Sequence, residues 1–141
     1  MVSSVILPDG ELYCCTKSNK QYMSLNYHRS YTGRKGKSFW KSSISRKLEF
    51  EIFYEADDKN WQDYRGNYWG VLNNGLTIIG RDEERLCKFP HNPNPNVPWH
   101  GFPVSPAESV NDTPPTPFVK KWEADKVISR RMAYHIIKRN I

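Results

Sequence analysis

Nine of the ten prolines lie within residues 88–117, and this clustering limits the possible fold more than any other feature of the sequence. Proline fixes φ and has no backbone N–H, so it disrupts the interior of a helix and is excluded from central strands. Residues 88–117 are therefore predicted to form an irregular connection. This connection separates a strand-rich part, residues 1–87, from a helical C-terminus, residues 118–141.

Two patterns in the strand-rich part predict strands. Residues 2–7 and 11–16 flank a Pro-Asp-Gly turn, which predicts a hairpin. Apolar residues alternate with mainly acidic ones over residues 48–56, which predicts a strand with one buried face and one acidic face. The apolar positions are Leu48, Phe50, Ile52, Tyr54 and Ala56.

A second hairpin is predicted over residues 68–80. Its two arms, residues 68–72 and 76–80, are rich in β-branched and aromatic side chains and flank Asn73-Asn74-Gly75. Asparagine and glycine tolerate the positive φ that a type I′ turn requires. This is the strongest short-range signal for a hairpin in the chain.

Two short helices are predicted at the C-terminus, over residues 118–124 and 127–139. Thr116 and Pro117 suit the N-cap and N1 positions of the first. The second is amphipathic, with a basic outer face that includes Arg130, Arg131 and Lys138. The expected fold is a single α+β domain: an antiparallel sheet of four to six strands with the two helices packed on it.

The cysteines and the start of the chain suggest a location. Cys14 and Cys15 are adjacent, Cys87 is distant, and three is an odd number, so we expect free thiols and a reducing compartment. The first residues lack the basic and apolar regions of a signal peptide, and no apolar run is long enough to span a bilayer. These features favour a cytoplasmic protein.

Basic residues are segregated within residues 12–48, which carry nine of them and no acidic residue. Aromatic residues lie between the cations. Cations can neutralise phosphates while aromatic rings stack on unpaired bases, so the pattern predicts a surface for single-stranded nucleic acid, with RNA favoured. The candidate binding residues are Lys17, Lys20, Arg29, Tyr31, Arg34, Lys35, Lys37, Trp40 and Lys41, together with Arg130, Arg131 and Lys138 on the last helix. The alternative is an ordinary solvated basic face.

A possible catalytic group lies further along the chain. Metal-independent RNA cleavage needs a base, an acid and a cation near the phosphate. His91 and His100 titrate near neutral pH, Arg81 and Arg85 could supply the charge, and Glu84 could orient a histidine. The alternative is that both histidines only pack a loop onto the core.

Metal and cofactor motifs give weaker signals. Cys87, His91 and His100, with Cys14 or Cys15, have ligand chemistry for zinc, but the usual ligand spacings are missing, so no metal or cofactor is predicted. The glycine-rich segment near Lys37 does not match a phosphate-binding loop.

Two classes of function follow from these patterns. The first is a nucleic-acid-binding protein, with a metal-independent ribonuclease as its more specific form, because a small basic α+β domain with histidines and no metal motif resembles the general profile of compact bacterial ribonuclease toxins. The second is a non-enzymatic immunity or regulatory subunit that docks on a larger protein through its aromatic and proline-rich surface. Fold-level analogy cannot decide between them.

Overall fold

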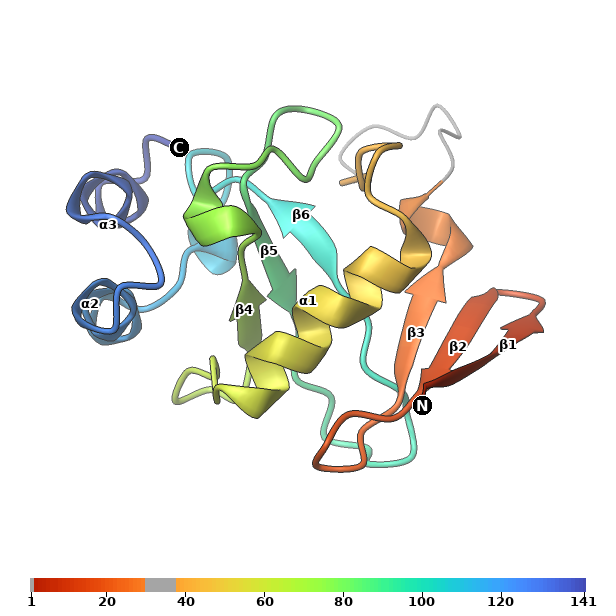
Figure 1. The fold of residues 1–141 in the computed structure, drawn as a ribbon. Coiled ribbons are helices and arrows are strands. Elements are labelled where there is room, and N and C mark those ends of the chain that lie inside the picture. The colour runs from red at the N-terminus through yellow and green to blue at the C-terminus, as the bar shows by residue number, and fades with distance from the viewer. Residues whose placement is uncertain (1, 30–37) are drawn as a thin grey trace.

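The computed structural model describes residues 2–29 and 38–141, which form two three-stranded antiparallel sheets and three α-helices (Figure 1). The α+β class is confirmed, but each sheet has three strands instead of the expected four to six. The first sheet has the order β1 (Ser3–Leu7), β2 (Gly10–Cys14), β3 (Tyr22–Leu25), and the second β4 (Tyr68–Gly70), β5 (Leu86–Phe89), β6 (Phe102–Val104). The α-helices are α1 (Arg46–Asp58), α2 (Thr116–Ala124) and α3 (Arg130–Ile137), and the 3₁₀ turns are Asn26–His28, Asn73–Gly75 and Val110–Asp112.

The first predicted hairpin is confirmed as β1 and β2. Leu7 pairs with Gly10 across the two-residue turn, and the pairing continues to Ser3 and Cys14. Gly10 also permits β3 to approach, because a Cβ at this position would lie 2.1 Å from the carbonyl oxygen of Ser24.

The strand predicted over residues 48–56 is wrong, because this segment is the helix α1. Ser45 caps the helix by accepting a hydrogen bond from the Leu48 amide at 3.1 Å. The buried positions include Glu49, Ile52, Phe53 and Ala56, which have the i, i+3, i+4, i+7 spacing of one helix face. The alternation of apolar and acidic residues predicts a strand only if Glu49 faces solvent, whereas its side chain is buried.

The second predicted hairpin is also wrong, since β4 pairs with β5 and not with residues 76–80. Asn73, Asn74 and Gly75 do have positive φ, as the sequence suggested. However, the Asn74 side-chain amide donates hydrogen bonds to the carbonyls of Lys126 and Val127. The turn is thus held against the connection between α2 and α3, and the chain after it does not return beside β4.

The last helix confirms the predicted amphipathic pattern with shifted bounds, whereas α2 begins at Thr116, so Pro115 and not Thr116 occupies its N-cap position. The helix α3 begins at Arg130 because Ser129 caps it by accepting from the Met132 amide at 3.1 Å. Met132, Ala133 and Ile136 are buried, while Arg130 and Arg131 are exposed. Both helices lie beside the second sheet (Figure 1).

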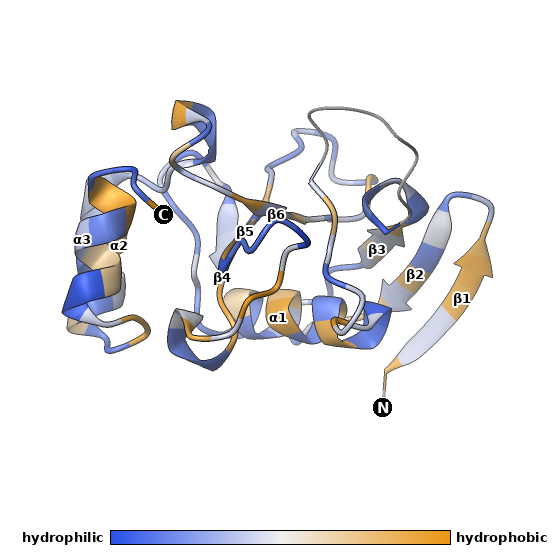
Figure 2. Cartoon of the chain, turned by 90° about the horizontal axis from the view of Figure 1, so that it is seen from above, coloured by the Kyte–Doolittle hydropathy of each residue, from blue (hydrophilic) through white to orange (hydrophobic). Residues whose placement is uncertain are grey.

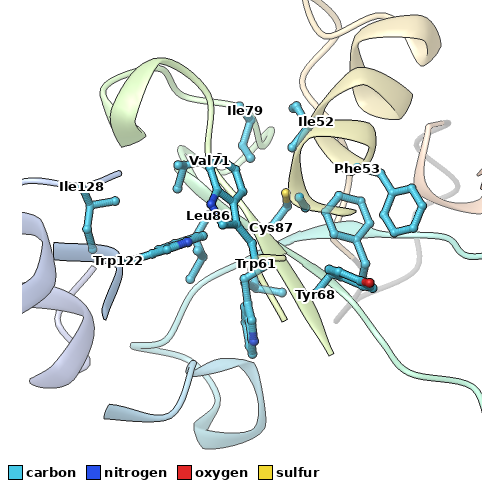
Figure 3. Packing of buried hydrophobic residues seen from close by; sticks show 14 of the residues in the cluster. Ile52, Phe53, Trp61, Tyr68, Val71, Ile79, Leu86, Cys87, Trp122 and Ile128 are labelled. Carbon is cyan, nitrogen blue, oxygen red and sulfur yellow. The ribbon is translucent and has the colours of Figure 1, made fainter. Parts of the chain in front are cut away.

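One buried apolar cluster connects these elements. The helix α1 contacts both β3 and β4, so it links the two sheets. Trp122 of α2 packs edge-on against Trp61 with ring centroids 5.4 Å apart. Figure 3 shows Trp122, Ile128, Val71 and Leu86 among the buried side chains of this cluster.

The cysteines differ from the expectation of three free thiols. Cys14 and Cys15 are joined in a disulfide at the end of β2, and Cys87 is a free, buried thiol.

Pro103 lies within β6, the edge strand of the second sheet, where a missing N–H is tolerated. Within residues 2–29 and 38–141, no helix combines the length and the apolar character needed to cross a membrane.

Candidate functional site: a histidine-lined pocket

A pocket of about 690 Å³ lies between the β2–β3 connection and the loop from Pro90 to His100. Its size is within the range of small-ligand sites in proteins. Both sequence-predicted histidines, His91 and His100, line it, and so does Lys20. The remaining lining residues are mainly prolines and polar amides: Asn19, Gln21, Asn92, Asn94, Pro90, Pro93, Pro95, Pro98, with Cys14, Cys15, Ser18, Val97 and Trp99.

The backbone of Trp99 fixes one wall of this pocket. Trp99 accepts a hydrogen bond from the Met23 amide at 2.7 Å and donates one to Gln21 at 2.9 Å, so the loop runs parallel to the start of β3. The Trp99 ring packs on Phe53 and Tyr68, with centroids 5.6 and 5.0 Å away. The next residue, His100, therefore projects from a well-anchored segment.

The His100 imidazole is half-buried and has aromatic neighbours. Its ring lies parallel to that of His28, with centroids 6.4 Å apart, and His28 in turn stacks on Phe102 at 5.1 Å. Nδ1 of His28 donates to the Ser38 carbonyl at 2.9 Å, which fixes the orientation of the His28 ring. Burial lowers the pKa of the His100 imidazole below its usual 6.5, so this ring is mostly neutral at pH 7.

His91 is exposed near the start of the same loop. Its amide donates to the Asn67 side chain at 2.9 Å, and its ring lies 6.2 Å from that of Trp99. Between the two histidines, the side chains of Asn92 and Asn94 each accept a hydrogen bond from the amide two residues later.

Gly66 limits where the His91 ring can lie. Gly66 has φ of +89°, and a Cβ there would be 3.0 Å from Cγ of His91. Replacing Gly66 with alanine should displace this ring and cost about 1 kcal/mol of folding free energy, because alanine does not tolerate positive φ. Altered His91 imidazole resonances in NMR spectra, together with a modest loss in denaturant midpoint, would confirm it. Unchanged resonances would contradict it.

Lys20 is the cation in the pocket wall, and it has a carboxylate partner. Its ammonium lies 3.1 Å from Asp57 and 2.6 Å from the Ser18 hydroxyl. Its side chain is 30% exposed. A bound phosphate would therefore compete with Asp57 for Lys20.

The other predicted catalytic residues lie elsewhere. Arg81, Glu84 and Arg85 belong to the segment just before β5, and none of them lines the pocket. Glu84 accepts from the Asp82 amide at 2.9 Å, and Arg85 donates to the Leu76 carbonyl at 2.5 Å. The Arg81 guanidinium lies over the Phe39 ring at 5.7 Å. These contacts stabilise the turn at residues 80–85. Arg81, Glu84 and Arg85 are therefore close to His91 in the sequence but not part of its pocket in the fold.

Several candidate phosphate-binding cations are paired with acidic residues of α1. Lys17 lies 3.4 Å from Asp58, and Arg29 lies 3.4 Å from the buried Glu49. Trp40 is only 3% exposed and donates to the Gly101 carbonyl, so its ring belongs to the core. The sequence predicts one basic surface over residues 12–48, but α1 places carboxylates next to part of it.

The remaining candidates are distributed differently. Lys41 is exposed, and no ion pair among the described residues involves it. Tyr31, Arg34, Lys35 and Lys37 lie outside the described residues. Arg130, Arg131 and Lys138 are exposed on or just after α3.

Residues 116–141 carry seven basic and two acidic side chains, which makes the helical end a second basic region of the described chain. This surface is separate from the histidine-lined pocket, because α2 and α3 lie beside the second sheet (Figure 1).

A buried polar cluster next to α1 was missed by sequence reasoning. Glu49 accepts hydrogen bonds from the Tyr22 hydroxyl at 2.5 Å and the Ser24 hydroxyl at 2.8 Å, and it faces Arg29. Burial outweighs these three favourable partners and raises the pKa of the Glu49 carboxyl to about 7. A glutamate in the middle of an apolar helix face is the signal that could have indicated it.

The zinc alternative receives no support from the side-chain positions. In the described part of the chain, no three histidine, cysteine, aspartate or glutamate residues are grouped to hold a metal ion.

Comparison with known proteins found no matching family model, no matching curated protein and no matching solved structure. The functional argument therefore depends on the geometry of this chain.

Proposed function

We propose that the protein binds single-stranded nucleic acid, with RNA favoured, and that the histidine-lined pocket receives one nucleotide with its phosphate. The observation that carries this proposal is that His91, His100 and Lys20 line the same pocket. The asparagine and glutamine side chains around them can both donate and accept hydrogen bonds, as the edges of unpaired bases require. The exposed cations of α3 provide a second, sequence-independent attraction for phosphate.

The more specific form of the proposal is metal-independent cleavage of the RNA backbone. Neutral His100 accepts the proton of the ribose 2′-hydroxyl, and the 2′ oxygen attacks the adjacent phosphorus. The bond to the 5′ oxygen breaks, and His91 acts as the general acid that gives a proton to this leaving oxygen. The products are a 2′,3′-cyclic phosphate and a 5′-hydroxyl, so no further reactant is needed. Lys20 stabilises the charge on the phosphate oxygens.

A cytoplasmic location and a toxin-like role belong to the same proposal. The toxin-like role depends on cleavage of cellular RNA, which the protein would meet in the cytoplasm.

Binding can be tested by the salt dependence of the affinity for a labelled single-stranded RNA. We expect log Kd to rise steeply with log salt between about 50 and 200 mM. The combined R130A, R131A and K138A variant should reduce the slope by about 2, because each lost phosphate contact removes about 0.7 for a single strand. Lys59→Ala removes an exposed cation already paired with Glu55 and serves as the control. A slope near zero for the unmodified protein would contradict the proposal.

The second candidate is docking on a larger protein partner through the proline-rich loop. The prolines at the pocket rim and the 39% exposed side chain of Val97 favour it, since such rigid apolar surface suits a protein interface. A salt-insensitive interaction with a protein, combined with no RNA affinity, would favour this candidate.

A further inference from the structure

The strand β1 is an unprotected sheet edge. All five of its residues are exposed, and within the described residues β1 pairs only with β2. Figure 2 shows β1 at the margin of the molecule, with its hydrophobic end in orange. Monomeric proteins usually protect such edges with charged residues, proline or a bulge, but Ser3–Leu7 contains no charged residue and no proline.

The hairpin geometry determines which backbone groups face outward. Leu7 and Gly10 close a two-residue turn, so they form a hydrogen-bonded pair, and the pairing type then alternates along the ladder. Val5 therefore directs its N–H and C=O toward β2. Ser4 and Ile6 direct theirs to the free edge, where they can pair with another strand.

An exposed apolar side chain and a pocket lie on the same face of β1. Ile6 is 82% exposed, the highest value among the large apolar side chains of the described residues. Ser4, two residues away on the same face, lines a pocket of about 560 Å³. The rings of Tyr13, Phe50 and Tyr54 give this pocket an apolar part that suits an aliphatic side chain, and its remaining lining residues are Val2, Glu11, Lys47 and Glu51.

We propose that β1 pairs with β1 of a second copy of this chain, antiparallel and centred on Val5. This register makes Ser4 and Ile6 of opposite copies a hydrogen-bonded pair, which satisfies both outward-facing residues. It also places each Ile6 beside the partner's Ser4, at the mouth of the pocket. The two-fold axis produces both contacts at once, as an isologous interface requires.

The self-complementary register, which places each Ile6 beside the partner's Ser4, makes a second copy the occupant of this edge. The protein has a net charge of +6, so most surfaces of two copies repel each other. The paired strands contain no charged side chain, and pairing them brings no like charges face to face. Because each strand has only five residues, the interface is small, and we expect a concentration-dependent dimer.

The oligomeric state tests this proposal. Sedimentation velocity over a concentration series should show a monomer–dimer equilibrium. Ile6→Lys should raise the dimer dissociation constant by more than about 100-fold, because two isoleucine side chains per dimer lose their burial. Leu76→Lys, at a 69% exposed apolar position outside β1, should leave the constant unchanged. A monomer at every concentration, or equal effects of both variants, would overturn the proposal.

The register can be tested separately by cross-linking. Val5 faces its own copy across the axis as a non-hydrogen-bonded pair, whose Cα separation is within disulfide range. Under oxidation, Val5→Cys should give a covalent dimer, whereas Leu7→Cys, which lies opposite Ser3, should not. Cross-linking at Leu7 instead of Val5 would contradict this register.

Discussion

Replacement of His100 by asparagine should lower the rate of RNA cleavage by about 10²–10⁴-fold, the usual contribution of a general base. Asparagine fills similar space and keeps a hydrogen-bonding group, but it cannot accept the proton of the 2′-hydroxyl. RNA affinity should change little, because the cations remain. Cleavage is measured with labelled RNA in the presence of EDTA, so that contaminating metal-dependent nucleases do not contribute.

His135 offers a matched control for this experiment. It lies on α3, outside the pocket, and its ring bonds to Asn140. His135→Asn should retain full activity. Equal activity of H100N and the unmodified protein would remove His100 from the mechanism, and loss of activity in both variants would indicate a structural effect.

The pH profile adds a second readout for His100. A base works only when deprotonated, so kcat/KM should rise with pH through the lowered pKa of His100, below 6.5. Activity should therefore persist to lower pH than an ordinary histidine would permit.

The free energy of unfolding should fall by roughly 3 kcal/mol between about pH 4.5 and pH 7 because of Glu49 alone. Its pKa is about 7 in the folded protein and 4.5 in the unfolded chain. Within this window the folded state holds a proton that the unfolded state has lost. Stability is therefore greatest below the unfolded pKa and decreases as pH rises through the folded value.

Glu49→Gln should remove this pH dependence, since an amide does not titrate. Denaturant titrations at about pH 4.5 and about pH 8 would measure the difference. Glu55→Gln, on the same helix but 49% exposed, provides the control and should retain the slope of the unmodified protein. A slope that survives in E49Q would show that another group is responsible.

Glu49→Ala should be more damaging, with a loss of about 3–5 kcal/mol at about pH 8, where the Glu49 carboxyl is mostly ionised. It leaves Arg29 without its carboxylate partner, and the Arg29 side chain is only 13% exposed.

The elements predicted correctly are those whose signals are local. The Pro-Asp-Gly turn fixed the first hairpin, and the apolar face of α3 was visible at helical spacing. The wrong prediction of a strand at α1 arose because Glu49 is buried, so the buried positions of this helix are not all apolar. At Asn73-Asn74-Gly75 the backbone conformation was anticipated, but the hydrogen bonds from Asn74 to residues 126 and 127 depend on tertiary structure and cannot be read from local sequence.

The candidate site was predicted in part for the same reason. His91 and His100 belong to one loop, so their proximity follows from the chain. Arg85 and His91 are near in sequence, but the strand β5 lies between them. Because this four-residue strand is extended, its two ends are about 10 Å apart. Likewise, the pairing of Lys17, Lys20 and Arg29 with acidic residues could be predicted only by knowing that residues 46–58 form a helix.

The two sides of the histidine-lined pocket differ in how they are held. Backbone pairing with β3 and aromatic packing anchor the wall at Trp99, whereas Asn92 and Asn94 are braced by their own local turns. A ligand would thus contact one rigid wall and one wall that can adjust its conformation. The part of the ligand that contacts the rigid wall would determine selectivity. Ligands of different size would be accommodated at the adjustable wall.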